Sequence, residues 1–314
     1  MLIWGAFIVM IILFLALDLG VFNKRDHVIS TREASRWTAL WVTVAMSFSG
    51  VVHLLFTNGM IENPTGLTPD GATIKYITGY LIELSLSVDN VFVIAVIFSA
   101  FSIPPKYQHR VLFWGILGAI ICRAVMILFG VALINKVDWI IYVFGVFLLY
   151  TAYKMLRSLE TKFNPRKSFV FKQIKKYIPL THSIHGRDFI IKRMGITAAT
   201  PLLVALIIIE LTDVMFALDS IPAILAITAD PFLVFSSNIM AILGLRSMYF
   251  LVSRMLAKFR FINYSLAVIL GFVGFKMLTS HYIAIPEWAS LTLIIAALMG
   301  GISISILIPD EYNL

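Results

Sequence analysis

Two long apolar stretches of this chain carry acidic side chains where a membrane protein would have hydrocarbon neighbours. They cover residues 79–90 and 209–222. Together they hold five carboxylates: Glu83, Asp89, Glu210, Asp213 and Asp219. A charged side chain at a bilayer centre costs about 2.5–3.5 kcal/mol even on the lenient insertion scale, so such residues usually face a protein interior or an aqueous cavity. They commonly mark an ion or proton path, which makes these five carboxylates candidate cation ligands.

Helical spacing places further oxygen atoms beside these acids. At 100° per residue, Glu83 and Asn90 fall about 20° apart on one helix face, and Asp213 and Ser220 are related in the same way. Glu210 and Asp213 are neighbours at positions i and i+3. The spacing therefore predicts a cluster of carboxylate, amide and hydroxyl oxygens.

The remaining two acids leave two geometries open. In a regular helix Asp89 and Asp219 lie about 120° away from Glu83 and Asp213, so either they contact a second neighbouring helix or the helix loosens between the acids. Pro222 favours loosening in the second stretch, because its nitrogen cannot donate to the Leu218 carbonyl four residues back. A freed carbonyl beside Asp219 would be one more oxygen ligand.

The ligand types indicate a hard cation. The candidate set contains no cysteine or histidine, and sites built from oxygen alone suit divalent ions such as Mg²⁺, Ca²⁺ or Mn²⁺. Arg123 and Arg246 lie in neighbouring apolar runs and are expected to pair with carboxylates and reduce the charge of the site. Five carboxylates and two arginines leave a net charge of −3, which a divalent ion would bring to −1.

The same charge balance predicts proton coupling. Crowded carboxylates away from water favour proton uptake, and a metal ion that binds them expels those protons. We therefore expect proton antiport, with Glu210 or Asp213 as the proton carrier, because their spacing crowds them most.

Composition gives the class of protein that must hold this site. Hydrophobic residues make up 60% of the 314 positions and charged residues only 13%, with a mean hydropathy of +0.93. A helix needs about 20 consecutive apolar residues to span a bilayer, and several runs approach this length, so a polytopic helical membrane protein is predicted. The net charge of +8 comes from basic residues in loops, where it sets orientation rather than indicating nucleic acid. The single cysteine excludes an intramolecular disulfide.

About nine transmembrane helices are expected. Basic loops place the N-terminus outside and the C-terminus in the cytoplasm. The one long loop, 158–197, is strongly basic, so it is predicted to be cytoplasmic and to favour contact with anionic lipid. The expected spans are 2–22, 37–56, 72–101, 111–134, 139–157, 198–229, 231–256, 261–278 and 286–308.

An internal repeat relates residues 72–157 to residues 198–280, with 1–71 and 281–314 as flanking helices. Three landmarks recur in the same order: Glu83-x5-Asp89-Asn90 with Asp213-x5-Asp219-Ser220, Arg123 with Arg246, and Tyr153-Lys-Met-Leu156 with Phe275-Lys-Met-Leu278. The two triplets enter the membrane from opposite sides, and an inverted repeat with a polar site near the midplane is a secondary-transporter architecture. A gene duplication without transport is the alternative.

Four motifs resemble the TerC family of integral membrane proteins, in its Alx-like branch. They are residues 83–92 (ELSLSVDNVF), 110–119 (RVLFWGILGA), 217–222 (ALDSIP) and 237–246 (SNIMAILGLR). The resemblance covers nearly the whole chain and implies a bacterial inner-membrane protein that exports Mn²⁺, within a group first named for tellurite resistance. It implies site roles for Glu83, Asp89, Asn90, Asp213, Asp219 and Ser220. Leu84 stands where branch members often have lysine.

A metal-ion exporter is therefore the leading hypothesis. An enzyme is disfavoured, because no zinc-protease histidine pair or nucleophile motif lies in any expected span. The competing class is a membrane scaffold or stress-response protein that docks partners through the loop 158–197 without transport.

Overall fold

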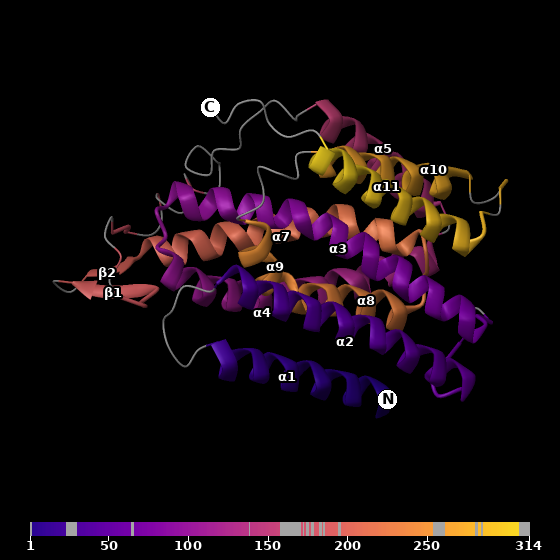
Figure 1. The fold of residues 1–314 in the computed structure, drawn as a ribbon, viewed down its shortest axis with the longest axis horizontal. Helices are drawn as coiled ribbons and strands as arrows, with labels where there is room; N and C mark the ends of the chain where they lie inside the picture. The colour runs from indigo at the N-terminus through magenta and orange to yellow at the C-terminus, as the bar shows by residue number, and fades with distance from the viewer. Residues whose placement is uncertain are drawn as a thin grey trace.

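The computed structural model is a bundle of helices that run side by side along its long axis (Figure 1). A short β-hairpin projects from one end, and α1 forms one edge of the bundle opposite α5, α10 and α11. The structure describes residues 2–22, 30–63, 66–137, 139–157, 179–181, 186–193, 196–253, 261–279, 282–283 and 285–307, with single positions at 171, 173, 176 and 184.

The helices follow the apolar runs of the sequence. The first half comprises α1 (Leu2–Phe22), α2 (Thr31–Thr57), α3 (Pro69–Ala100), α4 (Pro105–Lys136) and α5 (Ile140–Arg157). The second half comprises α7 (Pro201–Leu225), α8 (Pro231–Leu243), α9 (Leu245–Val252), α10 (Ile262–Thr279) and α11 (Glu287–Leu307). Between them, β1 (Ile190–Arg193) pairs antiparallel with β2 (Ile196–Ala199).

Four of these helices begin with the same start signal. α3, α4, α7 and α8 each have a proline in the first turn, where the missing N–H needs no partner and the fixed φ suits a helix. The Thr68 hydroxyl accepts from the Gly71 N–H at 3.1 Å, and the Asp230 carboxylate accepts from the Leu233 N–H at 2.9 Å. These caps fix where α3 and α8 begin.

The fold class predicted from the sequence, an all-α polytopic membrane protein, is confirmed. Within the described residues, six helices are long and apolar enough to cross a membrane, and the bent pair α8 and α9 makes a seventh. The apolar segments Leu2–Leu17 and Tyr264–Thr279 are shorter. The total of nine spans stays a prediction.

The structure does not form a single straight helix over the expected span 231–256. α8 and α9 meet at Gly244 with a bend of 45°. The Ser247 hydroxyl donates to the Gly244 carbonyl at 2.9 Å, and glycine and serine pairs of this kind are common causes of kinks. A Cβ at Gly244 would lie 3.4 Å from Cβ of Trp41, so the glycine also lets α2 approach the bend.

Helix packing has the pattern that two related triplets would produce. α3 packs on α8 as α7 packs on α4, while α3 contacts α7 and α5 contacts α10. Exchanging the triplets leaves these pairs unchanged. α3 and α7 run in opposite directions. A Cβ at Gly79, early in α3, would lie 3.5 Å from Ile224 at the end of α7, whereas Asn90, later in α3, lines the same cavity as Ile209, earlier in α7. An inverted repeat requires this arrangement, and the two-fold axis itself stays a prediction.

The α5–α10 contact gives a first testable prediction. A Cβ at Gly274 would lie 2.9 Å from the Gly145 carbonyl oxygen, so the two backbones touch, as small residues permit between membrane helices. Gly274→Ala should separate α5 from α10 and destabilise the protein by about 1–3 kcal/mol. Thermal unfolding in detergent measures this. Gly300→Ala, with no atom within 4 Å of the new Cβ, is the matched control, and equal melting temperatures would contradict the prediction.

The basic loop is partly described. Residues 158–170 and most of 172–178 lie outside the described residues, so the docking role predicted for the loop 158–197 falls in part on residues that are not described. Near its end, the Arg110 guanidinium lies 5.1 Å from the Phe189 ring centroid, and the Thr200 hydroxyl donates to the Asp188 carbonyl at 2.7 Å. These contacts attach the hairpin to the start of α4 and α7.

Candidate functional site

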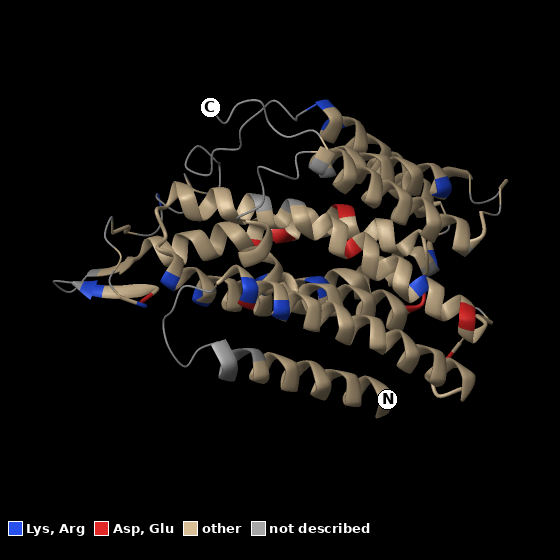
Figure 2. Cartoon of the chain, viewed as in Figure 1, with Lys and Arg blue, Asp and Glu red and all other residues tan. Residues whose placement is uncertain are grey.

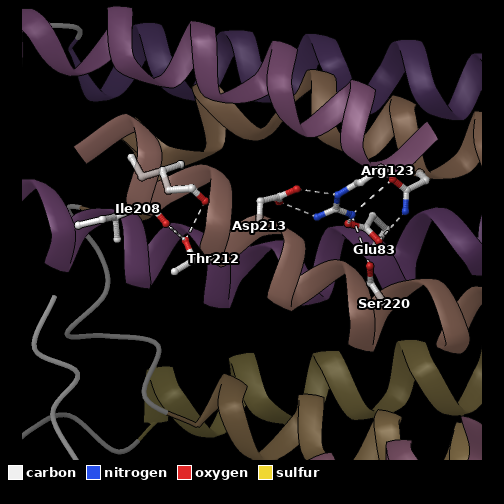
Figure 3. A network of polar contacts seen from close by, with 8 residues as sticks. Glu83, Arg123, Ile208, Thr212, Asp213 and Ser220 are labelled. Atoms are coloured by element: carbon white, nitrogen blue, oxygen red, sulfur yellow. Dashed lines mark hydrogen bonds and ion pairs between the residues drawn. The ribbon is translucent and has the colours of Figure 1, made fainter. Parts of the chain in front are cut away.

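A buried arginine lies at the centre of the polar residues inside the bundle (Figure 3). Arg123 of α4 is 1% exposed. Its Nη2 donates to Asp213 Oδ1 at 2.9 Å and its Nε donates to Asp213 Oδ2 at 3.2 Å, which makes a two-point contact with α7. Its Nη1 forms an ion pair with Glu83 Oε1 of α3. One guanidinium therefore joins three helices.

Two uncharged side chains complete this network. Asn238 of α8 is fully buried, and its Nδ2 donates to Glu83 Oε2 at 2.9 Å. Arg123 Nη1 also lies 3.4 Å from both Asn238 Oδ1 and Ser220 Oγ. Both predicted three-helix repeats thus contribute to this network, the first through α3 and α4 and the second through α7 and α8.

The members of the charged triad, Glu83, Arg123 and Asp213, each lie well inside their helices, α3, α4 and α7, rather than near a helix end. Figure 2 shows acidic residues between the two ends of the helices, among tan surroundings. Ions taken out of water need close partners, since removing one member of a buried pair costs about 3–5 kcal/mol. Two carboxylates and one guanidinium leave the triad with a net charge of −1, which a cation could balance.

A small cavity adjoins the triad between α3, α4 and α7. Its volume is about 20 Å³, and its lining includes Asn90, Thr212 and Asp213. The Asn90 side-chain oxygen is buried and has no hydrogen-bond partner among the described residues, and the same holds for Ser87 Oγ one turn earlier. A cavity needs about 10–15 Å³ to admit a water-sized particle. The cavity therefore has room for one particle the size of a water molecule, beside the oxygen-bearing side chains of Asn90, Thr212 and Asp213.

Glu210 lies against α4 rather than inside the triad. A Cβ at Gly118 would overlap Glu210 Oε1, so the carboxylate occupies the space that the glycine leaves open. Glu210 is partly buried and lies one turn from Asp213 on α7. A side chain at position 118 would displace it.

Asp219 makes a separate contact on another side of α7. The Thr151 hydroxyl of α5 donates to Asp219 Oδ1 at 3.0 Å. α7 stays α-helical through Pro222, which lies three residues from its end, so the backbone does not loosen between Asp213 and Asp219. The sequence left two geometries open for Asp219, a loosened helix or a contact with a second helix. The structure has the second, because Asp219 contacts α5.

The structure does not gather all the predicted site residues in one place. Glu83, Asp213, Ser220 and Arg123 meet in the network, Asn90 lines the cavity, Glu210 lies against α4 one turn before Asp213, and Asp219 contacts α5. Arg246 is buried in α9, and the Asp89 side chain lies outside the described part of the structure. Among described side chains, no three His, Cys, Asp or Glu residues are grouped to hold a metal ion.

Two contributors were not predicted as site residues. Asn238 supplies an amide from the apolar run of α8, and Thr151 supplies a hydroxyl from α5. The signal for Asn238 was an amide eight residues before Arg246 in the same run, and Thr151 stands three residues before the repeated Lys154. Only the helix packing shows which acids they contact.

Comparison with known proteins identifies the family. The model of the integral membrane protein TerC family matches residues 69–312. The chain belongs to the TerC family. The match includes every predicted ligand and both arginines, so the residues of the network all lie within the region that defines the family.

Relatives of this TerC protein match over nearly its full length. An uncharacterized membrane protein of Myxococcus xanthus is 46% identical over 98% of this chain and 93% of its own. Proteins named "Putative membrane-bound redox modulator Alx" are 41% identical in Salmonella typhi (99% and 95% coverage) and in Escherichia coli K12 (95% and 92%). No solved structure is significantly similar to the chain.

Proposed function

We propose that this TerC protein is a secondary transporter, rather than an enzyme, that exports Mn²⁺ from the cytoplasm across a bacterial inner membrane. The observation that carries the proposal is the buried Glu83–Arg123–Asp213 triad. One carboxylate would already balance the charge of Arg123. The second carboxylate gives the triad a negative charge, next to a cavity lined by an unpartnered Asn90 oxygen.

The donor chemistry suits this ion. Carboxylate, amide and hydroxyl oxygens are the ligands that hard divalent cations prefer. We retain the full set of proposed ligands, with Arg123 and Arg246 in the charge-balancing role: Glu83, Asp89, Asn90, Glu210, Asp213, Asp219 and Ser220.

Arg123 acts in this proposal as a tethered cation. It occupies oxygens of both Glu83 and Asp213, so an arriving Mn²⁺ must take at least one of these contacts from the guanidinium. When the ion leaves, Arg123 returns and the carboxylates are not left without a positive partner. Ion binding and movement of Arg123 between two positions are thereby coupled, which supplies the differential contacts that a conformational change requires.

Proton antiport follows from the same electrostatics. Glu210 and Asp213 are one turn apart, and a cation bound beside them displaces protons that the empty site has taken up. Everted vesicles that contain a pH dye test this step. Mn²⁺ entering the lumen should drive protons out and raise the internal pH, whereas Mn²⁺ uptake without proton movement would rule out antiport.

Export itself is tested by radioactive manganese uptake into everted vesicles. Wild-type vesicles should accumulate Mn²⁺, and Asp213→Asn should reduce uptake to background because it removes the two-point partner of Arg123 and one proposed ligand. Glu62→Gln, at an exposed acid in the loop before α3, is the matched control. Background uptake by the wild type would favour the scaffold hypothesis, and full uptake by Asp213→Asn at equal abundance would contradict the site.

A further inference from the structure

A second and much larger cavity lies between α4, α5 and α7. Its volume is about 650 Å³, within the range of about 300–1,000 Å³ typical of ligand pockets. Phe129 and Leu133 of α4, Phe144 and Phe147 of α5 and Pro222 of α7 line it. α5 packs mainly on α10 and touches α4 only sparsely, so the cavity opens between two membrane-spanning helices. Its walls are hydrocarbon and aromatic rings.

One end of this cavity is cationic. Lys136, in the last turn of α4, is the charged residue among those that line it. Lys136 is exposed and forms no ion pair among the described residues. Trp139, three residues later, is 63% exposed, and tryptophan at a helix end is typical of the membrane–water interface. Lys136 therefore lies at the depth of lipid headgroups.

We propose that this cavity binds an anionic phospholipid, with an acyl chain between α4 and α5 and the phosphate at Lys136. A water-soluble ligand has no route into an apolar space that faces the membrane. A phospholipid supplies both the hydrocarbon for the walls and the negative charge for the unpaired lysine. A net anionic headgroup neutralises Lys136, whereas a zwitterionic one leaves its own cation beside it.

The bound lipid would contact the helix that holds a predicted site residue. Phe147 of the cavity wall lies one turn before Thr151, which donates to Asp219. On α7, Leu218 and Ile221 line the cavity on either side of Asp219 in sequence. The lipid would thus set the distance between α5 and α7 at the Thr151–Asp219 contact. Lipid binding itself does not depend on which ion, if any, the protein transports.

Native mass spectrometry of the full-length protein tests this inference. Wild type should retain one phosphatidylglycerol about five-fold more strongly than phosphatidylcholine, the effect of one basic residue at an anionic surface. Lys136→Gln should abolish that preference. Lys106→Gln, at an exposed lysine near the start of the same helix, should retain it. An unchanged preference in Lys136→Gln would overturn the proposal.

A second pair of variants tests the cavity. Ala132→Trp, at an exposed position in its lining, should reduce retention of both lipids, and Val125→Trp, on α4 outside the lining, should not. Wild-type retention in Ala132→Trp would overturn the proposal. The proposal would also be overturned if the wild type were a dimer without bound lipid and Ala132→Trp made it monomeric, because a second copy of the chain would then fill the cavity. The lysine pair changes only exposed side chains and decides the question even if Ala132→Trp does not fold.

Discussion

Arg123→Leu is expected to destabilise the protein by about 3–5 kcal/mol, the largest effect of any single substitution in the network. The change leaves Glu83 and Asp213 buried together without their shared positive partner, at 0% and 8% exposure. Unfolding in detergent, followed by tryptophan fluorescence, should show a large drop in melting temperature and a low yield of folded protein. Arg157→Leu, at an exposed arginine whose contact is with Tyr153, is the matched control.

The cause of this loss is separable from lost packing. In the Arg123→Leu background, Glu83→Gln together with Asp213→Asn removes both uncompensated charges and should recover at least half of the stability. A purely steric role for Arg123 predicts no recovery, because the amides have the same size as the acids. Wild-type stability in Arg123→Leu alone would show that the carboxylates are not held as an ionised triad.

The members of the triad could be singled out from the sequence for a physical reason. A charged residue within an apolar run is so costly in lipid that it needs a partner or a cavity, and the runs contain few candidates. Glu83, Asp213 and Arg123 are among those few, and the structure brings them together. The start of a helix could also be predicted where a proline follows a capping side chain, as at Pro231 after Asp230.

Helical spacing placed Ser220 beside Asp213, but two other uncharged partners, Asn238 and Thr151, could not be predicted from the sequence. Serine, threonine and asparagine within a span can satisfy themselves on a nearby backbone carbonyl, as Thr212 does with Ile208 (Figure 3), so their presence alone predicts no contact. Asn238 and Thr151 became part of the polar contacts only through the packing of α8 on α3 and of α5 on α7. Pro222 does not loosen α7 between Asp213 and Asp219 as predicted. Its missing N–H falls near the end of the helix, where few backbone hydrogen bonds remain to be disrupted.

Asp219→Asn is expected to reduce Mn²⁺ uptake by more than about 100-fold, whereas Thr151→Val should reduce it by about 10–100-fold, the usual effect of losing a partner that orients a ligand. The two changes separate charge from orientation. The asparagine still presents an oxygen to the Thr151 hydroxyl but lacks the negative charge. The valine keeps the charge on Asp219 and removes only the hydroxyl that donates at 3.0 Å.

Initial rates in everted vesicles over a range of Mn²⁺ concentrations measure both variants. Thr151→Val should raise the KM for Mn²⁺ more than it lowers the maximal rate, because a disoriented carboxylate binds the ion more weakly but keeps its charge. Thr151→Ser should restore the wild-type KM by returning the hydroxyl. If Thr151→Ser and Thr151→Val behave alike, the hydroxyl does not orient Asp219. If Asp219→Asn transports as well as wild type at equal membrane abundance, Asp219 is not a ligand, and its bond to α5 only joins the two helices.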